Sequence, residues 1–480
     1  MRDHSRRSRA VSALGLLLAA CLSPSDASPP ALELPASSAP AEDLATWWTR
    51  FQDPQLDALI AHALEHNQDL AIAAARVLEA AALVRNADDW LPDANFSASA
   101  GRNETSDKNA FPRFAGIDRD NSAHAASVDI TWELDLWGRI RAAHDAALAD
   151  LLQNRENLHG ARAAIAAQTA QSYFRLVAID LRLRLSEDTL QNRRDVQRIQ
   201  QRRLALGTGT PLEAHQAEAD AEAVASLLPR LHQAQTSAAR ALLLLTGEQP
   251  AALQSPALQR RADLPSPPPV PPDLPSDLLA RRPDIRAAEA ALAAASARVD
   301  EARARYFPTI RLTGSIGQQS ESLTDLFVSP ATVWAFAASI FQPLTGLREI
   351  DAQHDAAQAR RLQAEAGYVR TVQTAFAEAY DAIGTRAASH DTLTAQQRRI
   401  DALQNAERVA TARHDAGAGS FLDLLDARRD LLTVRQERID TAADELVATV
   451  DVYRALGGGW SEAAPAPAGA SGGGSDGASR

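Results

Sequence analysis

Residues 281–317, RRPDIRAAEAALAAASARVDEARARYFPTIRLTGSIG, predict a helix that is followed by a strand. Apolar or small residues recur three and four positions apart from Ile285 to Tyr306, which is the seam of an amphipathic helix. Pro308 then ends the helical pattern, because proline has no backbone N–H to donate. Apolar and polar residues alternate after it, as they do on a strand with one apolar face.

A second copy of this pattern lies at residues 66–101, HNQDLAIAAARVLEAAALVRNADDWLPDANFSASAG. The helical spacing starts at Leu70, Pro92 interrupts it, and a strand-like alternation follows. The chain is therefore predicted to be internally duplicated, with a period too long for a solenoid. The expected divisions are a first repeat at 44–248, a Pro-rich link at 249–275 and a second repeat at 276–460.

The N-terminal segment has the features of a secretory signal that ends in a lipidation site. Several arginines precede the apolar run Ala10–Ala20, and the only cysteine of the chain, Cys21, follows at once. The residues before Cys21 resemble the bacterial lipobox, and Leu22 after it favours sorting to the outer membrane. We therefore expect a signal peptide at 1–20, diacylglycerol and an N-acyl group on Cys21, and a lipidated tether at 21–43.

Four segments have the alternation of strands, and the clearest is Ser127–Leu136. Each would also fit a half-buried strand of a soluble sheet. No run after the signal reaches the roughly 18 apolar residues of a membrane-spanning helix, so any further crossing would require strands. Four strands cannot close a barrel, and the chain must then oligomerise.

Two long regions without proline, 142–207 and 347–417, predict helices of roughly 100 Å if they are continuous. Each region reaches a glycine turn, after which a return helix runs to Gly247 or Gly457. The turns correspond in the two repeats and contain Gly207, Gly209, Gly417 and Gly419. The predicted fold is mainly α, with two helical hairpins and four strands for each chain.

Composition and motifs argue against several other functions. The net charge of −12 argues against nucleic acid binding. His62 and His66 are four apart on a predicted helix, but they have no third metal ligand at a suitable spacing. Catalytic and phosphate-binding motifs are missing, so we expect neither an enzyme, a bound cofactor nor a metal site. The 20 residues after Trp460 predict a disordered tail at 461–480.

Five separated motifs resemble the outer-membrane efflux lipoproteins of the TolC-like channel-tunnel family, which are the exit ducts of tripartite pumps. They are Trp47-Trp48 with Phe51 and Pro54, WELDLWGR at 132–139, RRPDIRAAE at 281–289, RHDAGAGSFLDLLDARR at 413–429 and YRALGGGW at 453–460. The resemblance implies a homotrimer in the outer membrane, with a twelve-stranded barrel and a periplasmic tunnel of helices. It also implies a periplasmic adaptor at the hairpin tips and an inner-membrane pump, of RND type.

The resemblance also assigns a gate. In the family, side chains on the second return helix close the periplasmic end, and the matching residues are Leu422, Asp426 and Arg429. Their spacing puts them on one helix face. Asp423 and Asp430 could serve instead, and without the resemblance all of these charges would be read as ordinary solvated ones.

Three alternatives to drug efflux remain open at this point. The same architecture serves metal-ion efflux and polypeptide secretion, and a coiled-coil scaffold without a pore would explain the hairpins. A scaffold would explain neither the strands nor the signal. We therefore expect a passive exit duct for drugs or other small toxic compounds.

Overall fold

A computed structural model describes residues 44–88, 90–104, 120–253, 258, 260–270, 281–328 and 330–460. The predicted signal peptide, the tether with Cys21 and the tail lie outside these residues. The described elements are η1 (Trp47–Phe51), α2 (Pro54–His66), α3 (Gln68–Ala87), β1 (Asp93–Glu104), β2 (Asp120–Leu134), α4 (Arg139–Ala205), α5 (Pro211–Ala225), α6 (Leu228–Leu245), α8 (Pro283–Ala304), β3 (Thr309–Ser320), η3 (Leu323–Asp325), β4 (Thr332–Phe341), α9 (Leu347–Asp415) and α10 (Phe421–Ala455). No described helix is both long and apolar enough to span a membrane.

The described residues divide into two compact units, and each draws on both sequence repeats. The first unit lies within Arg76–Asn154 and Ala287–Val369 and contains all four strands. The second unit lies within Leu32–Ala75, Arg155–Arg286 and Arg370–Arg480 and contains both hairpin tips. The prediction of a mainly α chain with four strands is confirmed.

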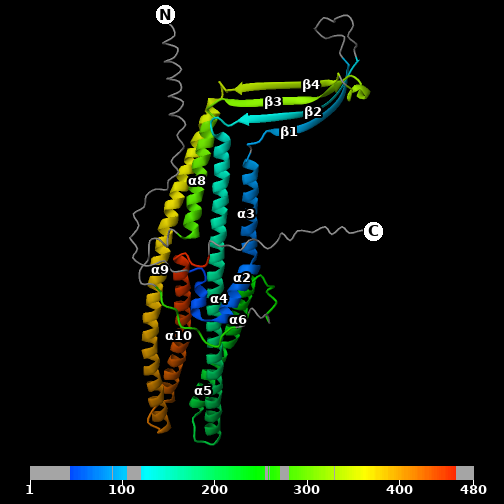
Figure 1. Cartoon of the computed structure of the whole chain (residues 1–480). Helices are drawn as coiled ribbons and strands as arrows, with labels where there is room; N and C mark the ends of the chain where they lie inside the picture. Colours follow the sequence, from blue (N-terminus) through cyan, green and yellow to red (C-terminus); the bar gives the residue numbers. More distant parts are fainter. Residues whose placement is uncertain are drawn as a thin grey trace, which may run out of the picture. The chain divides into compact units, whose positions relative to one another are not determined.

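The sheet of the first unit is antiparallel, with the strand order β1-β2-β3-β4 (Figure 1). The strand predicted at Ser127–Leu136 begins earlier, at Asp120, and ends at Leu134. It ends there because the side chain of Asp135 accepts hydrogen bonds from Ile140 N and Arg141 N, at 3.1 and 3.0 Å, and so caps α4.

The turn from α8 into β3 is held by an aromatic residue of the other repeat. Trp137 donates from Nε1 to the carbonyl of Pro308 at 2.7 Å, and its ring stacks on Phe307 with centroids 5.0 Å apart. The helical seam predicted before Pro308 is largely confirmed, since Ile285, Leu292, Ala295, Val299 and Ala302 are all buried. The motif WELDLWGR therefore helps to fix the place where the second repeat changes from helix to strand.

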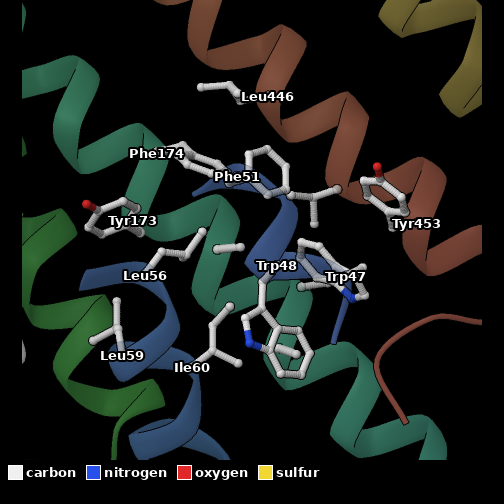
Figure 2. Close-up of a cluster of buried hydrophobic side chains, with 14 of the residues drawn as sticks. Trp47, Trp48, Phe51, Leu56, Leu59, Ile60, Tyr173, Phe174, Leu446 and Tyr453 are labelled. Atoms are coloured by element: carbon white, nitrogen blue, oxygen red, sulfur yellow. The ribbon is translucent and has the colours of Figure 1, made fainter. Parts of the chain in front are cut away.

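The core of the second unit joins the first and the last described elements of the chain (Figure 2). Trp47 is 1% exposed and stacks on Tyr453, with ring centroids 5.7 Å apart and planes 10° apart. Phe51 packs on Phe174 of α4 at 5.1 Å. Side chains from η1, α2, α4, α6, α9 and α10 complete this cluster. The motifs near residues 47 and 453 are thus explained as packing partners.

Helix α10 is bonded to α9 on one side and to α4 on the other. The bonds to α9 join Arg386 to Thr449 (3.2 Å), Gln396 to Thr441 (3.0 Å) and Glu407 to Arg428 (3.0 Å). The bonds to α4 join Gln171 to Asp451 (2.9 Å), Arg182 to Asp440 (3.2 Å) and Ser186 to Gln436 (3.2 Å). In both series one residue number falls as the other rises, so both helix pairs are antiparallel. The polar bonds keep the two hairpins in a fixed register.

The first return helix differs from the prediction of a single helix to Gly247. It divides into α5 and α6 at Ser226 and Leu227, just before Pro229. Proline provides no N–H for the hydrogen bond to the preceding turn, which explains the break. The corresponding helix of the second repeat, α10, contains no proline and is unbroken.

The described part of the Pro-rich link is bonded to helices of both repeats. Arg184 of α4 donates to the carbonyl of Ala262 at 2.7 Å, and the hydroxyl of Tyr453 in α10 donates to Pro269 at 3.2 Å. Arg260 of the link also forms an ion pair with Asp180 of α4. The link therefore fastens α4 to α10 in addition to connecting the repeats.

Arg282, from the stretch that predicts the fold, is a buried junction of three helices. Its guanidinium is 6% exposed and bonds Asp284 (2.8 Å) at the start of α8 and Glu378 (2.8 Å) on α9. It also donates to the carbonyls of Ala375 and Ala455, the last residue of α10, at 3.4 and 3.3 Å. Burial opposes the charge, but the bonds to Asp284 and Glu378 outweigh it and raise the pKa of Arg282.

Replacing Arg282 by methionine should lower the free energy of unfolding by about 3 kcal/mol, because two carboxylates and two carbonyls lose a buried donor. Urea unfolding of the detergent-solubilised protein, followed by circular dichroism at 222 nm, measures this. Arg281→Met is the matched control, because Arg281 is exposed. Equal stability of the two variants would contradict the assignment of Arg282 as a structural junction.

Candidate functional site

One face of the sheet is apolar across all four strands. The register aligns Phe96, Val128, Ile316 and Trp334 in a single row, and these side chains are 74, 40, 60 and 76% exposed. The neighbouring row, Asn95, Asp129, Ser315 and Ala335, lies on the opposite face and is mostly polar. A contiguous exposed apolar face of this kind is typical of contact with lipid or with another protein.

The start of α10 has one buried face and one exposed face. Phe421, Leu424 and Leu425 are buried against Ala217 of α5. Leu422 is 46% exposed, and the side chains of Asp426 and Arg429 are 54 and 63% exposed. Asp426 Oδ1 lies 3.3 Å from Arg429 Nη1. The structure thus brings the two predicted charges together and leaves Leu422 on the same side of the helix.

The two hairpin tips share one backbone geometry. Gly207 and Gly417 have φ of +69° and +70°, which glycine adopts without strain. A Cβ at Gly209 or at Gly419 would lie 3.0 or 2.9 Å from the Cβ of an arginine in the preceding helix. Each return helix then starts at a hydroxyl cap, Thr210 or Ser420. The glycines predicted at the tips are required by the turn itself.

Charges between the two hairpins were not predicted from the sequence. Arg193 of α4 forms an ion pair with Asp220 of α5 at 3.0 Å, with side chains only 9 and 10% exposed. Nearby, Arg428 of α10 bonds Glu407 of α9 at 3.0 Å. The side chains of these charges are at most about one third exposed, whereas those of Asp426 and Arg429 are 54 and 63% exposed.

Burial disfavours the charged forms of the inner ion pair. Burial raises the pKa of the Asp220 carboxyl, although Arg193, Arg428 and Arg429 act to lower it. Burial likewise lowers the pKa of Arg193, and the charge of Arg428 adds to this effect. A pair with both pKa values shifted toward neutrality contributes little stability of its own, but losing one partner would leave a buried charge.

A sequence signal for these charges does exist. In α10 the apolar seam runs through Leu424, Arg428 and Leu431, so the arginine occupies a position where an apolar residue is expected. In α4, Arg193 follows the buried Leu190 in the same way. Charged residues in an apolar helical seam would have marked these arginines as buried, although not their partners.

Other predicted site residues are accounted for as follows. His62 and His66 lie on α2 and stack with centroids 4.3 Å apart. Among the described residues, no group of three or more His, Cys, Asp or Glu side chains could hold a metal ion. The lipidation site, Cys21, lies outside the described residues.

Comparison with known proteins gives one family. The family model described as "Outer membrane efflux protein" matches residues 59–248 and 274–458. The two matched segments lie on either side of the Pro-rich link.

Individual relatives cover most of the chain. The cation efflux system protein CusC of Escherichia coli O6:H1 is 32% identical over 424 residues, which are 87% of this chain and 89% of CusC. The solvent efflux pump outer membrane protein SrpC of Pseudomonas putida is 34% identical over 415 residues, which are 86% of this chain and 87% of SrpC. The crystal structure of the outer membrane protein VceC from Vibrio cholerae superposes with a TM-score of 0.79 at 28% sequence identity. The superposition covers 87% of this chain and 99% of the VceC chain.

Proposed function

Because the chain belongs to the outer membrane efflux protein family, whose members are transport channels and not enzymes, we propose that it is the exit duct of a tripartite efflux system. In this proposal the duct is passive and conducts drugs or other small toxic compounds to the exterior. The observation that carries it is the apolar row across all four strands, found in a chain that also forms two long helical hairpins. An exposed apolar row is compatible with contact to membrane lipid, and long helical hairpins are compatible with a tunnel across the periplasm.

Three copies form the duct in this proposal. Each sheet has two open edges, β1 and β4, and a single sheet of four strands cannot close on itself. Twelve strands from three copies are enough for a water-filled lumen, whereas the eight strands of a dimer would be filled by side chains. The apolar rows would then face outer-membrane lipid, and the polar rows would line the lumen.

The hairpin tips, with Gly207, Gly209, Gly417 and Gly419, are the proposed contacts for a periplasmic adaptor. Their tight turns hold the ends of four helices in a fixed geometry, which gives a partner a rigid surface to bind. The inner-membrane pump, of RND type in this proposal, supplies the transport energy.

Leu422, Asp426 and Arg429 are the proposed gate. They project from the exposed side of α10 one turn apart, and three copies would bring three such sets together at a narrow end. Carboxylates that approach each other repel, so the pairing of Asp426 with Arg429 would lower the cost of a closed ring.

Metal-ion efflux is a second candidate, and the similarity to a cation efflux protein favours it. Copper(I) and silver(I) bind best to sulfur ligands. The chain contains only one methionine and one cysteine, at positions 1 and 21. A metal-exporting duct of this sequence would therefore let soft ions pass without coordinating them by sulfur.

Cys21 is the proposed attachment point of a lipid anchor, which would hold the chain at the outer membrane before its strands pair. The sequence around it is the support for this part of the proposal.

Deleting the gene should sensitise the bacterium to dyes and antibiotics in a disc-diffusion panel, because the pump would lose its exit. Sensitivity confined to copper or silver would favour the metal candidate. Loss of a secreted protein, with normal drug resistance, would overturn the efflux proposal.

The double substitution Asp426→Ala with Arg429→Ala should raise the conductance of the purified trimer in planar bilayers several-fold, because it removes the charged pair from the constriction. Arg438→Ala is the control, since Arg438 is an exposed arginine further along the same helix. Unchanged conductance of the double variant would exclude these residues as the gate.

Cys21→Ser should abolish incorporation of radiolabelled palmitate into the protein. The expected result is a labelled wild-type band and an unlabelled variant that retains its signal peptide. A labelled variant would show that the lipid is attached elsewhere.

A further inference from the structure

A cavity of about 340 Å³ lies between the two hairpins of the second unit. It is lined by α4 of the first hairpin and by α9 and α10 of the second. Three arginines face it, one from α4 (Arg193) and two from α10 (Arg428 and Arg435). Its size is within the range of cavities that hold small organic molecules.

The positive charges of the arginines that line this cavity are not all paired with carboxylates. Arg428 is bonded to Glu407 at 3.0 Å, and Arg193 lies 3.0 Å from Asp220. Arg435 makes no ion pair or hydrogen bond with any residue in the described part of the chain. Asp195 also lines the cavity and is paired with Arg198, an exposed residue of the same helix. Arg193 and Arg428 each have a carboxylate partner, whereas Arg435 has none among the described residues.

The geometry of Arg193 points in the same direction. Its side chain is nine-tenths buried, yet its Nε–H makes no well-directed hydrogen bond, despite the short distance to Asp220. A buried donor without a well-directed acceptor costs free energy, so the residues around Arg193 satisfy it incompletely. Burial lowers the pKa of Arg193 and the charge of Arg428 adds to this effect, although Asp220 and Glu407 act to raise it.

We propose that this cavity binds a small oxyanion, either an organic carboxylate or inorganic phosphate. Guanidinium groups bind both through paired N–H···O bonds. Arg435 is the principal contact, because it has no competing partner among the described residues, and the amide of Asn192 on α4 lies in the same lining. Leu431 and Leu432 supply an apolar wall for the carbon atoms of an organic acid.

The bound anion would bridge the two hairpins. Arg435 belongs to α10 and Asn192 and Arg193 belong to α4, so a ligand held by both sides opposes their separation. This second step, regulation of opening, rests on the proposed function of α10 as part of a gate. Binding itself does not depend on it.

The test of binding uses the full-length protein in detergent, with succinate and phosphate as separate probes and chloride at matched ionic strength as the reference. Wild type should show a saturable rise of about 3 °C in its unfolding temperature with at least one probe. Arg435→Gln should bind that probe about tenfold more weakly by calorimetry, since it loses a charge-assisted hydrogen bond. Binding of succinate would identify the ligand as an organic carboxylate, and binding of phosphate would identify it as inorganic phosphate.

The matched control is Arg438→Gln, which removes an exposed arginine outside the cavity and should bind as wild type does. Arg435→Lys keeps the charge without the paired donors and should be intermediate, which guards against a variant that is merely misfolded. Absence of saturable binding to wild type, or equal binding by Arg435→Gln, would overturn the proposal.

A bilayer recording separates the regulatory step from the proposed channel. The active probe should reduce the opening frequency of wild type and leave Arg435→Gln unchanged. Calorimetric binding without an effect on a conducting channel would refute the regulatory step alone. A protein that binds the probe but never conducts would instead refute the proposed function.

Discussion

The two open edges of the four-stranded sheet constrain everything the first unit can do. β1 and β4 each leave one row of backbone N–H and C=O groups without a strand partner among the described residues. An unpaired group of this kind costs several kcal/mol in hydrocarbon, yet the apolar row from Phe96 to Trp334 belongs in an apolar medium. Pairing of the edges with further copies, as in the proposed trimer, would meet both demands. The second unit has a large core of its own and depends less on assembly.

Much of the fold could be predicted from the sequence because helices and strands impose periods on it. The seam from Ile285 to Ala302, the alternation after Pro308 and the glycine tips all follow from local geometry. The break before Pro229 could have been predicted from the same rules. The role of Arg282 could not, because its acceptors lie on α9 and α10, far away in the chain.

Only part of the candidate site could be predicted from the sequence. The helical period correctly put Leu422, Asp426 and Arg429 on one exposed face. Whether that face closes a pore depends on how several copies of the chain are arranged around a common axis. The spacing of residues within one chain does not determine that arrangement. The inner charges, Arg193 and Asp220, were missed for a different reason, since a lone charge in a seam has no visible partner until the helices are packed.

Because Trp47 stacks on Tyr453, the core of the second unit can be completed only after the last described helix has been synthesised. One ring belongs to the first described residues and the other to the last described helix, so the core cannot be completed while the chain is still emerging. Contacts with so large a sequence separation form slowly and leave apolar surface exposed in the meantime. A chain that is cut short before α10 would never close this core. Completion of this core therefore requires a chain that extends at least to Tyr453.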